Sequence, residues 1–449
     1  MIGMRLTDAV QAMHARLIGA DAQFSGCSTD SRTLPSGALF FALSGEHFDG
    51  HRFLAEAAGR GARGAVVERE VADAGLPLLS VPDTRQALGL LAGNWRQRFD
   101  IPVVAITGSN GKTTVKEMLA AIFSQLAPTL VTPGNLNNDI GVPLTLFGLG
   151  GAHRYGVIEM GANHPGEIAL LTRLVRPKVA VITQCAPAHL EGFGSIEGVA
   201  RAKAEIYSGL DADGIAIINA DDAYAGYWRS CCPATRQISF GLRSGADVSA
   251  TQVQNNGGAM HFVLHTGAGK VPVRLPLLGA HNVMNALAAA ACATALEIPL
   301  PRIASGLEAM RAVKGRLQLK PGCNGARVLD DTYNANPTSL QAAVDVLATF
   351  PGHHWLVLGD MGELGPTADD LHTRAGVSAR QCGVERLFAL GALSQCAARA
   401  FGAGAEHFTD SEALVARLRP ALAADVAVLV KGSRAMAMER VVAAIVAED

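Results

Sequence analysis

A glycine-rich turn between an apolar strand and a helical segment most limits what this chain can fold into. Residues 103–107 read Val-Val-Ala-Ile-Thr, and the next residues are Gly108, Ser109, Asn110, Gly111, Lys112, Thr113 and Thr114. Glycines permit a tight turn whose N–H groups point at phosphate oxygens, and a helix N-terminus adds partial positive charge. Lys112 would reach the terminal phosphates and Thr113 would bind Mg²⁺. The segment therefore predicts a phosphate-binding loop for ATP.

The loop is shorter than the common G-x-x-x-x-G-K-[ST] pattern. Ile106 stands where the first glycine of that pattern would be, which leaves the form G-x-x-G-K-T-T. A strand before the turn and a helix after it favour a true phosphate loop over a chance glycine-rich turn.

Two polar side chains follow other apolar runs. Glu159 ends the run at residues 156–159, and His189 follows the run at 179–183. The carboxyl ends of parallel strands meet at one edge of a sheet, where ligands bind. Since Mg²⁺ prefers oxygen ligands, Glu159 is a candidate ligand, and His189 lies at the same edge.

The order of apolar runs predicts an α/β protein with three domains, at residues 1–99, 100–313 and 314–449. The first is a small α/β domain that ends in a helix over residues 84–99. The second and third alternate short apolar strands with helices, the pattern of parallel sheets; the third is Rossmann-like. The expected strands of these two domains are residues 103–107, 156–160, 179–183, 215–219, 326–330, 355–358, 386–390 and 426–430. Residues 246–278 look antiparallel, and an Ala-rich helix is expected over 282–296.

Composition narrows the class of protein. The chain has a net charge of −2, so it lacks the excess of basic residues that is typical of nucleic-acid-binding proteins. The eight cysteines show no C-x-x-C spacing, which favours free thiols in a reducing compartment. The N-terminal segment lacks the apolar core of a signal peptide, and the most apolar stretch is too short for a bilayer. We expect a cytoplasmic protein, monomeric by default, that is not inserted in a membrane and binds no nucleic acid.

Strings along the whole chain resemble the Mur ligase family, and within it the type that adds D-alanyl-D-alanine. The resemblance rests on the 108–114 loop and on these segments: 28–32 (STDSR), 132–143 (TPGNLNNDIGVP), 159–162 (EMGA), 189–193 (HLEGF), 202–206 (AKAEI), 279–282 (GAHN) with 285–288 (NALA), 315–316 (GR), 330–337 (DDTYNANP), 359–365 (GDMGELG) and 431–434 (KGSR).

The resemblance implies an ATP-dependent ligase that joins a carboxylate to an amine through an acyl phosphate, in peptidoglycan precursor synthesis and hence in cell shape and division. It implies ATP and two Mg²⁺ ions as cofactors. Lys112, Glu159, His189 and Lys203 would be catalytic, and Thr113, Glu159, His189 and Lys203 would serve the metals. Lys203 would act as a carbamate, since an ammonium repels Mg²⁺ and a carbamate offers anionic oxygens.

The resemblance also assigns the substrates. The loop, Asn282, Asn285, Arg316 and Asp331 would bind ATP, and the site would be completed by domain closure. UDP-N-acetylmuramoyl-tripeptide and D-alanyl-D-alanine would be held by Ser28, Thr29, Asp30, Ser31, Arg32, Asn135, Asn137, Asn138, Asn334, Asn336, Lys431 and Ser433. The 28–32 segment would take the UDP-sugar end.

Other readings stay open at this point. A Mur-type ligase for single amino acids or a folylpolyglutamate synthase would share most of these strings. A regulatory NTPase needs only the loop. A dinucleotide-dependent oxidoreductase is disfavoured, because no G-x-G-x-x-G follows a strand.

Overall fold

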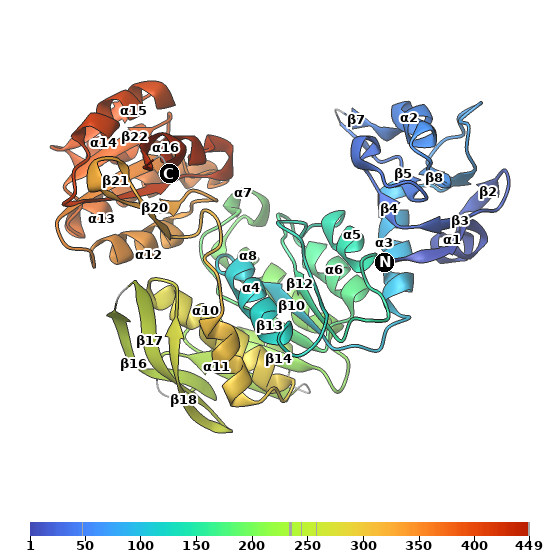
Figure 1. Ribbon diagram of the computed structural model, residues 1–449, viewed down its shortest axis with the longest axis horizontal. Helices are drawn as coiled ribbons and strands as arrows, with labels where there is room; N and C mark the ends of the chain where they lie inside the picture. The colour runs from blue at the N-terminus through green and yellow to red at the C-terminus, as the bar shows by residue number, and fades with distance from the viewer. Residues whose placement is uncertain (47, 233–235, 244, 257, 448–449) are drawn as a thin grey trace.

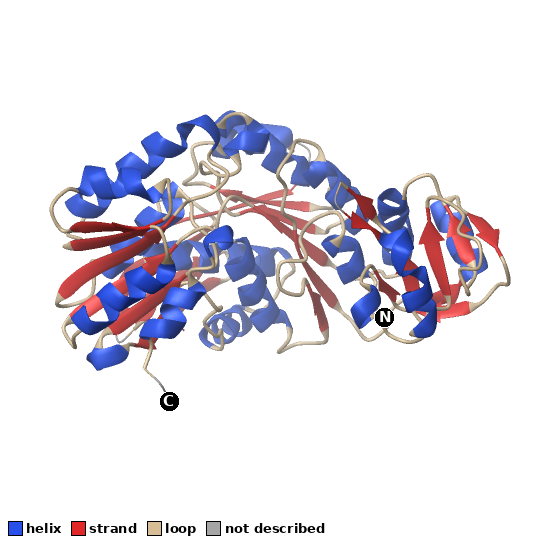
Figure 2. Cartoon of the chain, turned by 90° about the horizontal axis from the view of Figure 1, so that it is seen from above, coloured by secondary structure: helices blue, strands red, loops and turns tan. Residues whose placement is uncertain are grey.

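The computed structural model describes residues 1–46, 48–232, 236–243, 245–256 and 258–447. It has an α/β fold divided into three parts, with the N-terminal and C-terminal parts on opposite sides of a central one (Figure 1). Figure 2 shows strands running through the interior of each part with helices against them. The central part carries the phosphate-binding loop, and the N-terminal and C-terminal parts flank it.

The N-terminal part is a small parallel sheet extended by one antiparallel strand. Its strand order is β2-β9-β8-β5-β4, and only the β2–β9 pair is antiparallel. The elements are β1 (Gly3–Arg5), α1 (Leu6–Met13), β2 (Arg16–Ile18), β3 (Gln23–Ser25), β4 (Cys27–Ser28), β5 (Leu39–Phe41), β6 (Ser44–Gly45), β7 (Phe48–Asp49), α2 (Leu54–Gly59), β8 (Gly64–Val67), β9 (Leu78–Ser80) and α3 (Thr84–Arg96).

The central part is built on a sheet of order β11-β12-β10-β13-β14-β15-β16-β17-β18. It is parallel as far as β16 and antiparallel from there, so the expected antiparallel region continues the same sheet. The elements are β10 (Val103–Thr107), α4 (Lys112–Phe123), β11 (Thr129–Val131), α5 (Gly141–Leu146), β12 (Tyr155–Glu159), α6 (Glu167–Val175), β13 (Val179–Ile182), α7 (Leu190–Phe193), α8 (Ile196–Ala204), β14 (Ile215–Asn219), α9 (Ala225–Cys231), β15 (Arg236–Gly241), β16 (Val248–Asn256), β17 (Ala259–Thr266), β18 (Gly269–Leu275), α10 (Ala280–Ala295) and α11 (Leu300–Glu308).

The C-terminal part has the sheet order β19-β20-β24-β21-β22-β23, parallel except for the β19–β20 pair. The elements are β19 (Gln318–Pro321), β20 (Arg327–Asp331), α12 (Pro337–Leu347), β21 (His353–Gly359), α13 (Ala368–Gln381), β22 (Arg386–Leu390), α14 (Ser394–Phe401), β23 (Ala405–Phe408), α15 (Ser411–Leu418), β24 (Val426–Lys431) and α16 (Glu439–Ile445). The doubly wound pattern expected from the sequence is confirmed.

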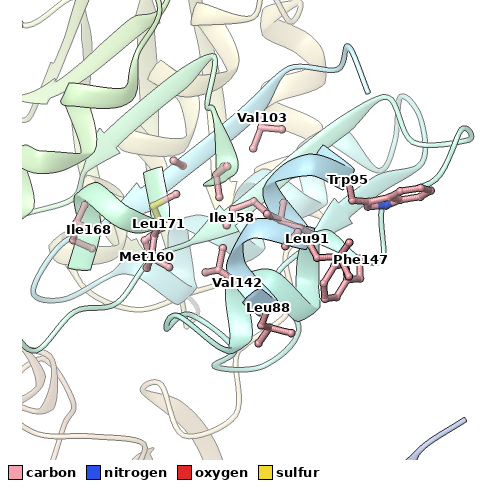
Figure 3. Close-up of a cluster of buried hydrophobic side chains, with 14 of the residues drawn as sticks. Leu88, Leu91, Trp95, Val103, Val142, Phe147, Ile158, Met160, Ile168 and Leu171 are labelled. Atoms are coloured by element: carbon pink, nitrogen blue, oxygen red, sulfur yellow. The ribbon is translucent and has the colours of Figure 1, made fainter. Parts of the chain in front are cut away.

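The N-terminal and central parts share one hydrophobic core. Helix α3 contributes Leu88, Leu91 and Trp95, which lie against Phe147 after α5 and Ile158 of β12 (Figure 3). Arg96, at the end of α3, is buried and its guanidinium donates to the carbonyl oxygens of Val175 (2.9 Å), Ile101 (3.1 Å) and Arg176 (3.3 Å). The C-terminal part instead has two further clusters, one of which also includes Leu278 of the central part.

The structure moves several predicted boundaries by a few residues. Strand β12 ends at Glu159 rather than at residue 160, and α3 ends at Arg96 rather than at 99. Helix α10 starts at Ala280, which puts Asn282 in its first turn. None of the described helices has the length and apolarity needed to cross a bilayer.

Candidate functional site

The glycine-rich segment connects β10 to α4 as expected. The buried strand β10 lies between β12 and β13, so the loop emerges at the carboxyl edge in the middle of the parallel region. The loop is pinned to the next strand, because Ser109 N donates to Gln184 O (2.9 Å) and Thr183 Oγ1 donates to Asn110 O (2.5 Å). This bonding fixes a turn whose amides precede a helix N-terminus, which is an anion-binding arrangement.

The loop glycines cannot be replaced without strain. Gly111 has φ +82°, and an added Cβ would lie 2.3 Å from Asn285 Oδ1 on α10. At Gly108 a Cβ would lie 1.9 Å from Thr183 Oγ1. The glycines therefore permit both the turn and the close approach of α10.

We predict that Gly111→Ala lowers ADP affinity at least about tenfold while the protein still folds, because the loop must shift to avoid Asn285. Isothermal titration calorimetry with ADP measures the effect. Gly166→Ala is the matched control, since Gly166 has a similar φ of +88° but no atom within 4 Å of the added Cβ. Equal effects on ADP binding in the two variants would contradict this role of Gly111.

Lys112 lies over the loop in the manner of a phosphate ligand. Its ammonium donates to Gly108 O (2.7 Å), and burial, aided by the Arg316 charge and opposed by Glu159, lowers its pKa. An ammonium held against a loop carbonyl is free to exchange that contact for a phosphate oxygen. Contact of Lys112 with the phosphates of ATP stays a prediction.

Glu159 provides a buried, partly unsatisfied carboxylate beside the loop. Its side chain is 2% exposed, Oε1 accepts from Asn137 Nδ2 (2.8 Å), and Oε2 finds no hydrogen-bond partner among the described residues. A desolvated carboxylate oxygen without a hydrogen bond is costly unless a cation lies against it, and the Lys116 ammonium comes only within 3.9 Å of it. The donor chemistry therefore fits Mg²⁺. In the described part of the chain no three His, Cys, Asp or Glu side chains form a metal cluster, so phosphate oxygens and water would supply other ligands.

His189 and Lys203 both lie against the aromatic ring of Phe193. The His189 ring packs edge-on against Phe193 with centroids 6.5 Å apart, and Lys203 Nζ lies 5.5 Å from the centroid of the same ring. Lys203 is 1% exposed, and burial, together with the Lys112 charge, lowers its pKa to about 7. His189 also pairs through Nδ1 with Glu363 Oε2 (2.5 Å), whose pKa this contact lowers. Glu363 belongs to the C-terminal part and was not singled out in the sequence.

The C-terminal part reaches the loop directly. Arg316 stacks over the Tyr333 ring (4.0 Å to its centroid) and donates to Thr113 Oγ1 (3.4 Å). Asn336 Nδ2 donates to Asn110 Oδ1 (2.8 Å), across 226 residues of sequence. The sequence predicted a site shared between these two domains, and the structure brings them together at the loop.

Asp331 forms a buried ion pair with Lys431. Oδ1 accepts from Leu317 N (3.1 Å) and Oδ2 from Lys431 Nζ (2.5 Å), which also donates to Asn334 O (2.8 Å). Burial lowers the pKa of Lys431, and Asp331 opposes that effect. Two residues that were predicted to bind different ligands therefore form one ion pair.

A cavity of about 450 Å³ lies among these groups, between the central and C-terminal parts. Predicted residues that line it are Ser109, Asn110, Gly111, Lys112, Thr113, Thr114, Asn137, Asn138, Glu159, His189, Asn282, Asn285, Arg316, Asp331, Asn334, Asn336 and Lys431. Arg85 of α3 also lines it and pairs with Asp139 (2.8 Å), a contact the sequence did not reveal.

Other predicted residues lie outside that lining. Gly108, Lys203, Asn135 and Ser433 do not line it, and Asn135 is exposed. The 28–32 segment is in the N-terminal part, where Ser31 Oγ donates to Glu56 (2.8 Å) and Arg32 pairs with Asp30 (2.9 Å). Asn138 Oδ1 accepts from Gly141 N (2.8 Å) at the start of α5, and Asn282 Nδ2 donates to Leu278 O (2.7 Å). Ligand contacts by these residues stay predictions.

A phosphate-binding loop and a buried acid, facing a second α/β domain across one cavity, define a nucleotide-dependent α/β enzyme whose site is divided between domains. Comparison with known proteins identifies the family. Residues 106–293 match the Mur ligase middle domain, 315–434 the Mur ligase, glutamate ligase domain, and 23–96 the Mur ligase family, catalytic domain. The chain belongs to the Mur ligase family.

Full-length relatives agree with this assignment. A UDP-N-acetylmuramoyl-tripeptide–D-alanyl-D-alanine ligase of Escherichia coli (strain K12) is 46% identical over 99% of both chains. A crystal structure of MurF from Acinetobacter baumannii has a TM-score of 0.94 at 38% identity and covers 99% of this chain and 98% of that one. The MurF ligase of Thermotoga maritima in complex with ADP has a TM-score of 0.85 at 27% identity, over 94% and 96% of the two chains.

Proposed function

We propose that this protein joins D-alanyl-D-alanine to UDP-N-acetylmuramoyl-tripeptide with ATP, in peptidoglycan precursor synthesis. The observation that carries the proposal is the single cavity that holds the phosphate loop, the unsatisfied Glu159 oxygen and the C-terminal residues Arg316 and Asp331. A carboxylate and an amine do not condense unaided at neutral pH, so such a ligase must bring phosphate, acid and amine into one enclosed place.

The chemistry proceeds in two displacements. A carboxylate oxygen of the tripeptide attacks the γ-phosphorus and ADP leaves, which gives an acyl phosphate. The dipeptide amine then attacks the acyl carbon to form a tetrahedral intermediate, which expels phosphate and loses a proton as the amide forms. The protein positions these groups and offsets their charge.

The chain's own groups divide this work. The loop amides and Lys112 would hold the β- and γ-phosphates, with Arg316 approaching from the other domain. Thr113 and Glu159 would hold one Mg²⁺, and His189 and carbamylated Lys203 a second; the ions would neutralise phosphate charge. Asn282 and Asn285 would contact the adenine, Asp331 the ribose, and Asn334, Asn336, Lys431 and Ser433 the peptide or dipeptide. The 28–32 segment would bind the UDP-sugar end.

The location and assembly state follow from the same proposal. ATP and a UDP-linked substrate are available in the cytoplasm, where free thiols such as the described cysteines persist. One chain supplies every residue that the proposed site uses, so a monomer suffices.

Phosphate release with purified enzyme tests the function. We expect release to need both UDP-N-acetylmuramoyl-tripeptide and D-alanyl-D-alanine, and single amino acids not to replace the dipeptide. Release that requires neither substrate would instead indicate an NTPase and would overturn the proposal. Use of a single amino acid would indicate another ligase type.

We predict that Lys203 carries a carbamate in the active enzyme. Its buried amine has a pKa near 7, so near neutral pH a large share is the neutral nucleophile that attacks CO₂. ¹³C-labelled bicarbonate should give a carbamate signal in the NMR spectrum of the wild type. Lys203→Arg should lack this signal, and Lys178→Arg, which changes a partly exposed lysine, should keep it. A wild-type spectrum without the signal would refute carbamylation.

A further inference from the structure

A buried lysine on the phosphate helix has no role in the site as described above. Lys116 lies one turn beyond Lys112 on α4, and its side chain is 1% exposed. An ammonium removed from water is costly unless oxygens surround it. Around Lys116 Nζ these are the carbonyl oxygens of Thr132 (3.0 Å) and Gly134 (3.0 Å), and carboxylate oxygens of Glu117 (3.1 Å) and Glu159 (3.9 Å).

The carbonyls that Lys116 holds belong to a segment that wraps Glu159. Thr132 Oγ1 accepts from Glu159 N (2.9 Å), and five residues later Asn137 donates to Glu159 Oε1 (2.8 Å). Asn137 O in turn accepts from Gly161 N (2.7 Å). The 132–137 segment is thus bonded to Glu159 at both its ends, and Lys116 bonds it to the helix that starts at the phosphate loop.

We propose that Lys116 is a positioning residue that keeps the Glu159 carboxylate and the 132–137 segment in register with the phosphate loop. The proposal rests on the function proposed above, in which Glu159 holds a cation. Lys116 is not among the described residues that line the cavity, so it acts through Glu159 and Asn137 and not by touching substrate.

The arrangement separates two properties of the site. Phosphate binding depends on the loop amides and on the Lys112 ammonium, whereas the Lys116 ammonium bonds to the carbonyl oxygens of Thr132 and Gly134. Cation binding depends on where Glu159 Oε2 points, which Lys116 and Asn137 set from two sides. A lysine with a purely structural role would change stability without separating these properties.

The experiment uses the full-length enzyme and the variants Lys116→Met, Lys116→Arg and Ile122→Val. Methionine is an unbranched side chain one atom shorter than lysine and lacks its charge and donors, whereas arginine keeps the charge and the donors. Ile122 is buried further along the same helix and serves as the matched packing control. Calorimetry measures ADP binding in EDTA and in Mg²⁺, thermal unfolding measures stability, and phosphate release gives kcat and KM.

We expect Lys116→Met to bind ADP in EDTA within about twofold of the wild type. Its Mg²⁺-dependent gain in ADP affinity and its kcat should fall by about tenfold or more, the usual effect of losing a group that orients a metal ligand. Lys116→Arg should recover part of both losses. Ile122→Val should change only the unfolding temperature.

Three outcomes would overturn the proposal. The first is a wild-type Mg²⁺ effect in Lys116→Met, and the second is a gain in Mg²⁺ affinity, which would show that the lysine only repels the cation. The third is loss of ADP binding in EDTA as well. If Lys116→Met does not fold, Lys116→Gln, which keeps an NH₂ donor group but no charge, undergoes the same measurements. A wild type that does not ligate would refute the proposed function instead, whereas the ADP measurements would still test Lys116.

Discussion

Glu159→Gln is expected to lower kcat by about two to three orders of magnitude, because metal stabilisation of phosphoryl charge is worth several kcal/mol. The glutamine oxygen can still accept from Asn137, but its second atom is then an NH₂ donor, which cannot ligate a cation, in the place of the Glu159 Oε2 oxygen. The measurement is the initial rate of phosphate release at several Mg²⁺ concentrations. The loss should lessen, without disappearing, as Mg²⁺ is raised.

Glu117→Gln is the control for this substitution. Glu117 lies 3.1 Å from the same Lys116 ammonium, but it is 41% exposed and does not line the cavity. Its replacement should leave the rate within about twofold, because the Glu117 carboxylate is partly in water, which screens its charge, and among the described residues it pairs with no group that lines the cavity. Wild-type rates for Glu159→Gln at every Mg²⁺ concentration would show that Glu159 holds no catalytic cation.

Breaking the Asp331–Lys431 pair is expected to cause the largest loss of stability. Asp331→Asn and Lys431→Met should each cost about 3–5 kcal/mol, because one member of a buried pair is left without its partner. The double variant Asp331→Asn/Lys431→Met should be more stable than the sum of the two losses predicts, since no charge then remains buried. Denaturant unfolding followed by a C-terminal probe such as Trp355 fluorescence measures these free energies.

Arg434→Met is the matched comparison for the buried pair. The Arg434–Glu439 pair (2.9 Å) lies in the same part of the protein, but the arginine side chain is 63% exposed. Its loss should cost less than about 1 kcal/mol. Additive losses in the double variant would show that Asp331 and Lys431 act independently and would contradict the coupling inferred from their contact.

Local patterns allowed the sequence to predict the elements that carry the loop. Strands β10 and β14 were predicted to the residue, because each is a short apolar run buried on both faces. The strands missed were of another kind. β11 and β23 are half-buried edge strands and lack an apolar run. β15 mixes polar and apolar residues, and its Ser239 donates to Asp247, eight residues further on.

The residues of the candidate site also fall into those that local sequence patterns predicted and those that they missed. Lys112, Glu159 and Arg316 were predicted because each stands in a recognisable string, and the structure places all three on one cavity. Lys116 and Arg85 were missed because their importance depends on partners brought close by folding. Glu363 lies in the quoted 359–365 string, but only the structure shows its contact with His189. The pairing of Asp331 with Lys431 joins positions 100 residues apart, so no local pattern contains it.

The shared core under α3 has a consequence for the length of substrate that the enzyme accepts. Because Trp95 and Arg96 fasten the N-terminal part to the central sheet, the span from the 28–32 segment to the phosphate loop is set by packing. If the sugar nucleotide is anchored at that segment, the distance from this anchor to the phosphate loop is the same for every substrate. A peptide one residue shorter would place its carboxylate about 3.5 Å short of the phosphate. The apolar contacts of α3, a helix far from the reacting groups, would then determine which peptide length the enzyme accepts.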